Sequence, residues 1–137
     1  MDLRSILVSA HSGIRWLVVI FAVIALVRFA VGYARGDKYG EREQQIWTAL
    51  SMTVRLQFVL GLIVFVWGIA SSFGSAWIRI AGEHAFTIII AIAALEMASA
   101  RAKRGTDPKQ QFMTSLIGVL VAFILIFLGV ARVSGWS

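Results

Sequence analysis

Two stretches of this chain continue for more than a membrane thickness without a charged residue, Leu56–Ile78 and Gln110–Ala131. About 20 consecutive apolar residues are enough for a helix to cross the hydrocarbon core of a bilayer, so each stretch can form one transmembrane helix. The whole chain is 59% hydrophobic and 15% charged, whereas soluble domains average about 25% charged residues. A soluble fold of 137 residues could not bury this much apolar surface. The sequence therefore predicts an integral membrane protein.

Two further apolar segments carry charges within them. Arg15 lies in Ile6–Val27, and Ile80–Ala100 contains Glu83 and Glu96. Each segment is still long enough to cross a membrane as a helix. We predict an all-α, integral membrane four-helix bundle that forms a single domain over residues 1–137, with helices at residues 6–31, 46–70, 80–100 and 110–131.

The positions of the basic residues predict the orientation of the bundle. Four helices place the connections around residues 32–43 and 101–109 on the same side, and these connections and their borders hold Arg28, Arg35, Lys38, Arg42, Arg101, Lys103, Arg104 and Lys109. The opposite side has only Arg4, Arg79 and Arg132. Because basic loops stay in the cytoplasm, we expect both termini on the periplasmic side of a bacterial inner (cytoplasmic) membrane, with the chain as a multi-pass protein.

Composition excludes several classes of function. The net charge of +6 is explained by this orientation signal, and no predicted loop is long enough to form a basic, aromatic-lined face for nucleic acid. The chain has no cysteine, so thiolate zinc sites, iron–sulfur clusters and covalently attached haem are excluded. Any cofactor must be held by His, Met or oxygen ligands.

The two histidines of the chain, His11 and His84, are the main candidate functional residues. Ionisable groups at membrane depth are costly and usually serve a function. The predicted helices that carry them have the same direction, so both histidines fall in the outer leaflet. Two histidines at similar depth on different helices of a bundle meet the requirement of a b-type haem, whose iron binds one imidazole on each face. We expect His11 and His84 to be the axial ligands of one haem.

Other roles fit the same residues. A histidine near a helix end can simply bond a backbone carbonyl or face lipid headgroups. A non-haem metal site has only Glu83 as a further oxygen ligand nearby, whereas zinc or iron usually takes three or four protein ligands. Arg15 lies one turn below His11 on the same face, where it can pair with a haem propionate or a quinone oxygen. Alternatively, Arg15 bonds helix carbonyls or extends to the membrane surface.

Arg55 and Glu96 form a second candidate pair, in the inner half of the membrane. Their expected depths match closely enough for an ion pair, which would compensate two charges that are costly in lipid. We expect a structural role, with a proton path or quinone contact through Glu96 as the alternative. Tyr33 and Trp47 fall near the inner membrane boundary and are expected to anchor the helices there.

Four short segments resemble a known group of proteins. They are His11-Ser12-Gly13-Ile14-Arg15-Trp16, Arg55-Leu56-Gln57-Phe58-Val59-Leu60-Gly61-Leu62, and Glu83-His84 with the later Ala100-Arg101-Ala102-Lys103-Arg104. This pattern resembles small bacterial four-helix membrane proteins described as cytochrome b-like, over the first three predicted helices and little of the fourth. The resemblance implies a second histidine pair where this chain has Arg55 and Glu96. This chain would then keep an outer haem site and replace the inner site with an Arg–Glu pair.

Two functions are compatible with these residues. The first is membrane electron transfer through one haem b near the periplasmic face, in a small subunit of a respiratory or photosynthetic quinol-linked complex. Its partners would be other subunits, the lipid bilayer and a periplasmic cytochrome or quinol, with quinone as a further ligand. The alternative is a non-catalytic assembly subunit of such a complex without a cofactor. In either case we expect an electron carrier or accessory subunit rather than an independent enzyme, since no nucleophile has a base beside it on a helix face.

Overall fold

The computed structural model describes residues 2–71 and 74–134, with the backbone alone for 132–134. The described residues form four helices, α1 (Leu3–Arg35), α2 (Glu41–Ala70), α3 (Ser75–Arg104) and α4 (Pro108–Ser134). Each helix is long and apolar enough to cross a membrane. The prediction of an all-helical chain with four helices able to span a membrane is confirmed for the described residues.

The helices extend beyond the predicted ranges, most clearly where charged residues follow an apolar segment. α1 continues to Arg35 and α3 continues to Arg104. Apolar runs mark the hydrocarbon-spanning part of a helix, whereas Lys, Arg and Glu have high helix propensity and prolong the helix into the polar region. α1 stops at Gly36, which has the left-handed φ of 69° and donates its N–H to the carbonyl of Gly32. This is the usual glycine-terminated helix end.

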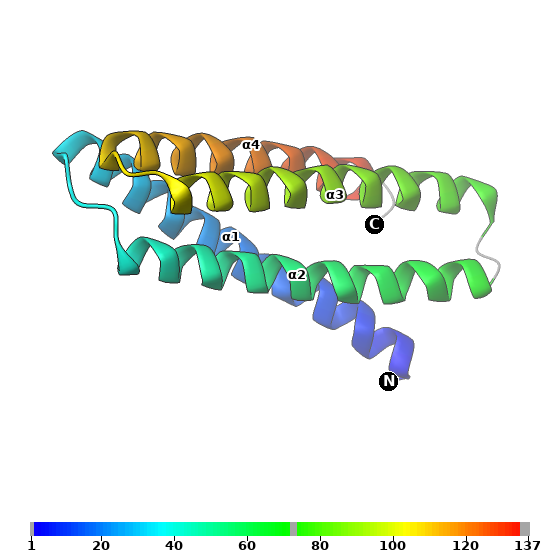
Figure 1. Cartoon of the computed structure of the whole chain (residues 1–137). Helices are drawn as coiled ribbons and strands as arrows, with labels where there is room; N and C mark the ends of the chain where they lie inside the picture. Colours follow the sequence, from blue (N-terminus) through cyan, green and yellow to red (C-terminus); the bar gives the residue numbers. More distant parts are fainter. Residues whose placement is uncertain (1, 72–73, 135–137) are drawn as a thin grey trace.

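The four helices form a ring in which each packs against two neighbours. α1 packs against α2 and α4, and α3 packs against the same two helices, so α1 and α3 occupy opposite corners. Figure 1 shows the α1–α2 and α3–α4 connections at one end of the bundle and the α2–α3 connection at the other. α1 crosses α2 and diverges from the other helices toward its N-terminus.

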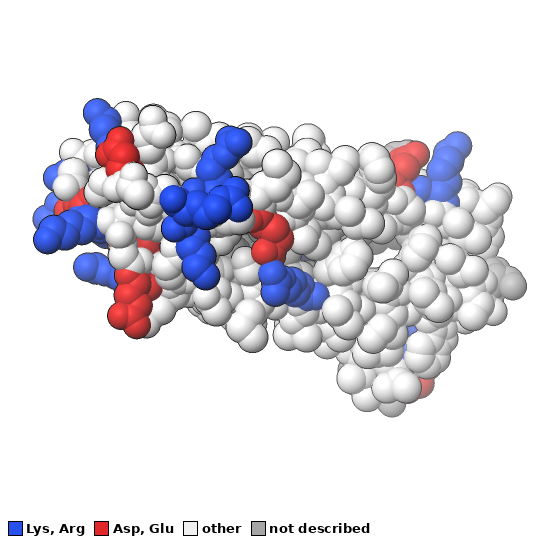
Figure 2. All heavy atoms as spheres, in the orientation of Figure 1, with Lys and Arg blue, Asp and Glu red and all other residues white. Residues whose placement is uncertain are grey.

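The two ends of the bundle differ in charge. In Figure 2, Lys and Arg side chains gather over the end with the α1–α2 and α3–α4 connections, whereas the face between the centre of the bundle and the opposite end is largely uncharged. We name this the basic end, which includes Arg35, Lys38, Lys103, Arg104 and Lys109. The opposite end, with Asp2 and the start of α3, is named the N-terminal end.

The centre of the bundle is apolar and closely packed. Its buried side chains recur at helical spacing and include Val18, Ala22, Ala25, Phe29, Leu50, Val54, Ala91, Leu95, Val119 and Ala122. Small residues bring the helices together, since any side chain at Gly118 of α4 would overlap Ala98 of α3. A central cavity of about 10 Å³ is lined by apolar residues of all four helices. It has room for one water molecule at most and offers that molecule no polar partner.

Candidate functional site

His11 lies half-buried on α1, where it packs against Gly61 of α2. A Cβ at position 61 would lie 2.9 Å from His11 Cε1, so a glycine is required for the ring to occupy this position. One turn earlier on α2, Gln57 donates its Nε2 to the backbone carbonyl of His11 at 2.6 Å. Within the described part of the chain, the buried atoms His11 Nδ1 and Gln57 Oε1 have no hydrogen-bond partner. The His11 ring thus packs against α2, while its Nδ1 has no hydrogen-bond partner among the described residues.

His84 lies half-buried on α3, and its ring is oriented by α4. His84 Nδ1 lies 2.7 Å from the carbonyl oxygen of Gly129. A carbonyl can only accept a hydrogen bond, so Nδ1 must carry a proton; in the neutral form of the ring, the lone pair is then on Nε2. Metal-bound histidines commonly show this arrangement. The same bond also fits the alternative role expected from the sequence, in which a histidine simply bonds a backbone carbonyl.

The structure brings His11, His84 and Arg15 into the same region, in the half of the bundle nearer the N-terminal end. The two imidazoles come from helices at opposite corners of the bundle. They are close enough for their charges to interact, and His11 and Arg15 are also close enough for this. The Arg15 guanidinium lies 5.4 Å from the centre of the Trp16 ring. Among residues 2–71 and 74–134, no group of three or more His, Cys, Asp or Glu side chains is placed to hold a metal ion.

Arg55 of α2 and Glu96 of α3 form a two-point ion pair. Arg55 Nη2 lies 2.8 Å from Glu96 Oε2, and Arg55 Nε donates to Glu96 Oε1 at 3.1 Å. The parallel arrangement of the two contacts is the strong geometry for an arginine–carboxylate pair. The side chains are 61% and 37% exposed, so this pair joins α2 to α3 on the outer surface of the bundle.

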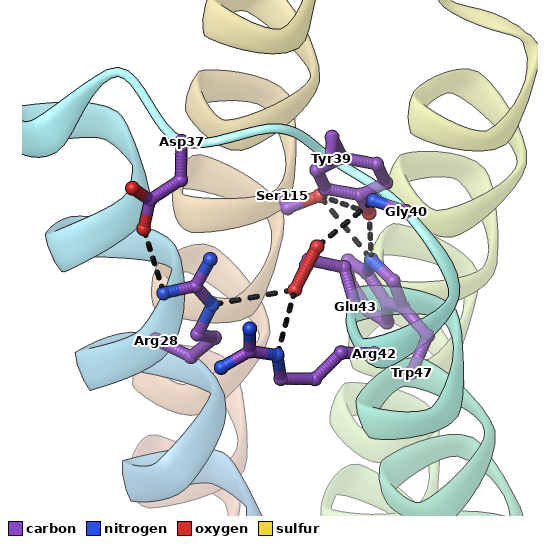
Figure 3. A network of polar contacts seen from close by, with 8 residues as sticks. All are labelled: Arg28, Asp37, Tyr39, Gly40, Arg42, Glu43, Trp47 and Ser115. Carbon is purple, nitrogen blue, oxygen red and sulfur yellow. Dashed lines mark hydrogen bonds and ion pairs between the residues drawn. The ribbon is translucent and has the colours of Figure 1, made fainter.

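A larger polar network, the basic-end cluster, lies where the α1–α2 connection meets the helices. It comprises Arg28, Asp37, Tyr39, Gly40, Arg42, Glu43, Trp47 and Ser115 (Figure 3). Arg28 donates Nη1 to Asp37 at 3.0 Å and Nε to Glu43 Oε2 at 3.3 Å. The other oxygen of the buried Glu43 accepts the backbone N–H of Gly40 at 2.8 Å. Both carboxylate oxygens are therefore bonded, which compensates for their removal from water.

The second half of the basic-end cluster links the connection to α4. The Tyr39 hydroxyl lies 2.9 Å from Ser115 Oγ, and Trp47 Nε1 donates to the Tyr39 hydroxyl at 2.9 Å and to Ser115 Oγ at 3.2 Å. Burial raises the pKa of Tyr39 above its ordinary value, and the hydrogen bonds to Ser115 and Trp47 act in the opposite direction. The Phe112 ring of α4 packs edge-on against Tyr39, with ring centres 5.1 Å apart. This cluster connects α1, α2 and α4.

The expectation that Trp47 anchors the bundle at the membrane surface is wrong, because its side chain is only 1% exposed. α2 begins at Glu41, before the predicted residue 46, so Trp47 lies in its second turn and faces the core. There its N–H finds buried partners, as a tryptophan in a core requires.

The sequence analysis also did not predict that Arg28 and Glu43 are partners. The sequence pattern that indicates the role of Glu43 is its spacing from Gly40. A glutamate three residues after the residue that precedes a helix can accept the backbone N–H of that residue.

Comparisons with models of known protein families, with curated proteins and with solved structures give no match to this chain.

Proposed function

We propose that this chain is a membrane electron-transfer protein that holds one b-type haem between His11 and His84, near the periplasmic face of a bacterial inner membrane. The observation that supports this most is that His11 and His84 lie on helices at opposite corners of the four-helix bundle and are close enough for their charges to interact. Haem iron takes one imidazole on each face, and bundle interiors are common sites for such cofactors.

The immediate surroundings of both rings fit axial ligands. The Gly129 carbonyl holds the proton of His84 on Nδ1, which leaves Nε2 with the lone pair that iron binds. The His11 ring lies in the space left by Gly61, and its buried Nδ1 is available for an orienting partner. A bound haem would supply a one-electron carrier. The chain would present the two imidazoles to the iron, and Arg15 could pair with a propionate through its planar guanidinium.

A single haem near one face cannot carry electrons across the whole bilayer. We therefore propose that the chain exchanges electrons with neighbours, as a small subunit of a respiratory or photosynthetic complex that uses a quinol. A periplasmic cytochrome or a quinol would be the redox partner, and Arg15 is the side chain suited to a quinone oxygen. The outward faces of the helices are apolar, with Ile20 and Phe127 among the exposed residues, and suit lipid and neighbouring transmembrane helices.

The difference spectrum of the purified full-length protein, reduced minus oxidised, tests the proposal. We expect the absorption bands of a b-type haem in the wild-type protein and their loss in His11→Ala and His84→Ala. Thr48→Val serves as a control, because the exposed Thr48 hydroxyl bonds only the Gln44 carbonyl within the described residues, at the basic end. A colourless wild-type protein that is folded and was produced with ample haem would refute the proposal.

One observation favours the alternative, a non-catalytic assembly subunit without a cofactor. Arg55 and Glu96 are partly exposed on the outer surface near the middle of α2, where lipid chains offer no polar contact. A neighbouring subunit that covers this surface would supply one. For this function, replacing both histidines by glutamine would leave the spectrum unchanged, and deletion of the chain would reduce the amount of assembled complex.

A further inference from the structure

Gln57 is a polar side chain in the contact between α1 and α2 that the proposed function does not yet use. Its amide nitrogen is bonded to the backbone carbonyl of His11 at 2.6 Å. Its amide oxygen is buried and without a hydrogen-bond partner in the described structure, and so is Nδ1 of the same histidine. The two unsatisfied atoms thus belong to two side chains that are already joined.

Buried polar atoms are nearly always hydrogen-bonded, so two unsatisfied atoms in one contact require an explanation. They are chemically complementary, because an imidazole Nδ1–H donates and an amide oxygen only accepts. The Gln57 amide is tethered to the His11 backbone, so its oxygen belongs to the same helix contact as the His11 ring, where a direct bond or one bridging water would satisfy both atoms.

We propose that Gln57 is a positioning residue for His11. Its amide oxygen accepts the Nδ1–H of His11, directly or through one water, and keeps the neutral ring in the Nδ1–H tautomer with the Nε2 lone pair free. The Gly129 carbonyl does the same for His84. Both rings then present the same nitrogen to a shared ligand, each oriented by an oxygen from a neighbouring helix. The purpose of this arrangement rests on the proposed haem site, but the hydrogen bond and the tautomer do not require haem.

Nitrogen NMR on the haem-free, full-length chain in detergent micelles tests this inference. The chemical shifts of the two ring nitrogens distinguish the tautomers at a pH where both imidazoles are neutral, and a His84→Gln variant assigns the signals. A free neutral imidazole prefers the Nε2–H form, so the Nδ1–H form at His11 needs a specific acceptor. We expect Nδ1–H at His11 in the wild-type protein and a shift to mainly Nε2–H in Gln57→Leu.

Three comparisons make the result specific. Gln57→Glu, with its carboxyl protonated, keeps an O–H donor for the His11 carbonyl and an acceptor oxygen for the ring, and should retain the Nδ1–H form. Gln45→Leu makes the same change at an exposed position of α2 near the basic end and should leave His11 unchanged. The His84 signal should be the same in all three variants. The inference is overturned if wild-type His11 carries its proton on Nε2, or if Gln57→Leu leaves the tautomer unchanged.

Haem titration then separates this inference from the proposed function. If both hold, Gln57→Leu weakens haem binding about 10- to 100-fold, the usual effect of removing an orienting partner of a metal ligand. If the wild-type protein binds no haem but its His11 tautomer responds to Gln57, the proposed function fails and the positioning role stands. If haem binds but the His11 tautomer is the same in the wild-type protein and in Gln57→Leu, the positioning role alone fails.

Discussion

Arg28 of α1 and Glu43 of α2 form an ion pair inside the protein, with Arg28 Nε 3.3 Å from Glu43 Oε2 and side-chain exposures of 15% and 3%. Glu43 also accepts the N–H of Gly40 at the start of α2. The same carboxylate therefore fixes the α1–α2 contact and the beginning of α2. Loss of one partner of a buried pair leaves the other charge uncompensated, which makes this contact a strong test of the fold.

Replacement of Arg28 by leucine should lower the free energy of unfolding by about 3 kcal/mol, because Glu43 would remain buried without its main cation. Arg42→Leu is the matched control. Arg42 approaches the same carboxylate at 3.9 Å but is 73% exposed, so its loss should cost less than about 1 kcal/mol. Unfolding in mixed micelles with increasing SDS measures both variants. Equal losses in the two variants would contradict a special role for Arg28.

A side chain at Gly32 should destabilise the bundle. Gly32 of α1 lies against the Phe112 ring of α4, and a Cβ at this position would overlap that ring. Gly32→Ala should therefore cost about 1–3 kcal/mol of unfolding free energy through overpacking. Gly13→Ala, on the same helix, has no atom within 4 Å of the new Cβ and should be neutral or stabilising by up to about 1 kcal/mol. The same SDS titration compares them, and a stabilised Gly32→Ala protein would disprove this contact.

Stability should fall at alkaline pH through Tyr39. Burial raises the pKa of this hydroxyl in the folded protein, so the folded state favours the protonated form. Its contribution is fully present below the unfolded pKa of about 10 and is lost as the pH rises through the higher folded pKa. Tyr39→Phe should flatten this part of the stability profile. The chain has 2 tyrosines, so the phenolate absorbance of a Tyr33→Phe variant reports on Tyr39 alone. A Tyr39 pKa at or below the ordinary tyrosine value would rule the mechanism out.

The Arg55–Glu96 pair should contribute little to stability in detergent, despite its close geometry. With side chains 61% and 37% exposed, we expect a coupling energy below about 1 kcal/mol in a double-mutant cycle of Arg55→Leu and Glu96→Leu. Exchange of the two charges, Arg55→Glu with Glu96→Arg, should restore most of that coupling. A coupling of several kcal/mol would instead show that the pair is shielded from polar surroundings.

The local sequence predicts the helices because a membrane-spanning segment must satisfy its own backbone hydrogen bonds and carry apolar side chains throughout. An uncharged run such as Gln110–Ala131, which lies entirely within α4, therefore indicates a spanning helix without knowledge of its neighbours. The same property limits the prediction of the ends. Arg35 and Arg104 lie beyond the apolar runs and still continue their helices, because hydropathy reports on the environment and helix propensity reports on the backbone.

The two histidines are candidates from the sequence because charged or polar groups are rare in spanning segments, and the helix directions predict similar depths for them. Their partners could not be selected in the same way. Gln57 meets His11, and Gly129 meets His84, only because α2 packs on α1 and α4 packs on α3 with a particular rotation about each helix axis. Trp47 faces Tyr39 and Ser115 instead of lipid for the same reason. Residue type and depth follow from local chemistry, whereas the face that each helix presents follows from the packing of all four helices together.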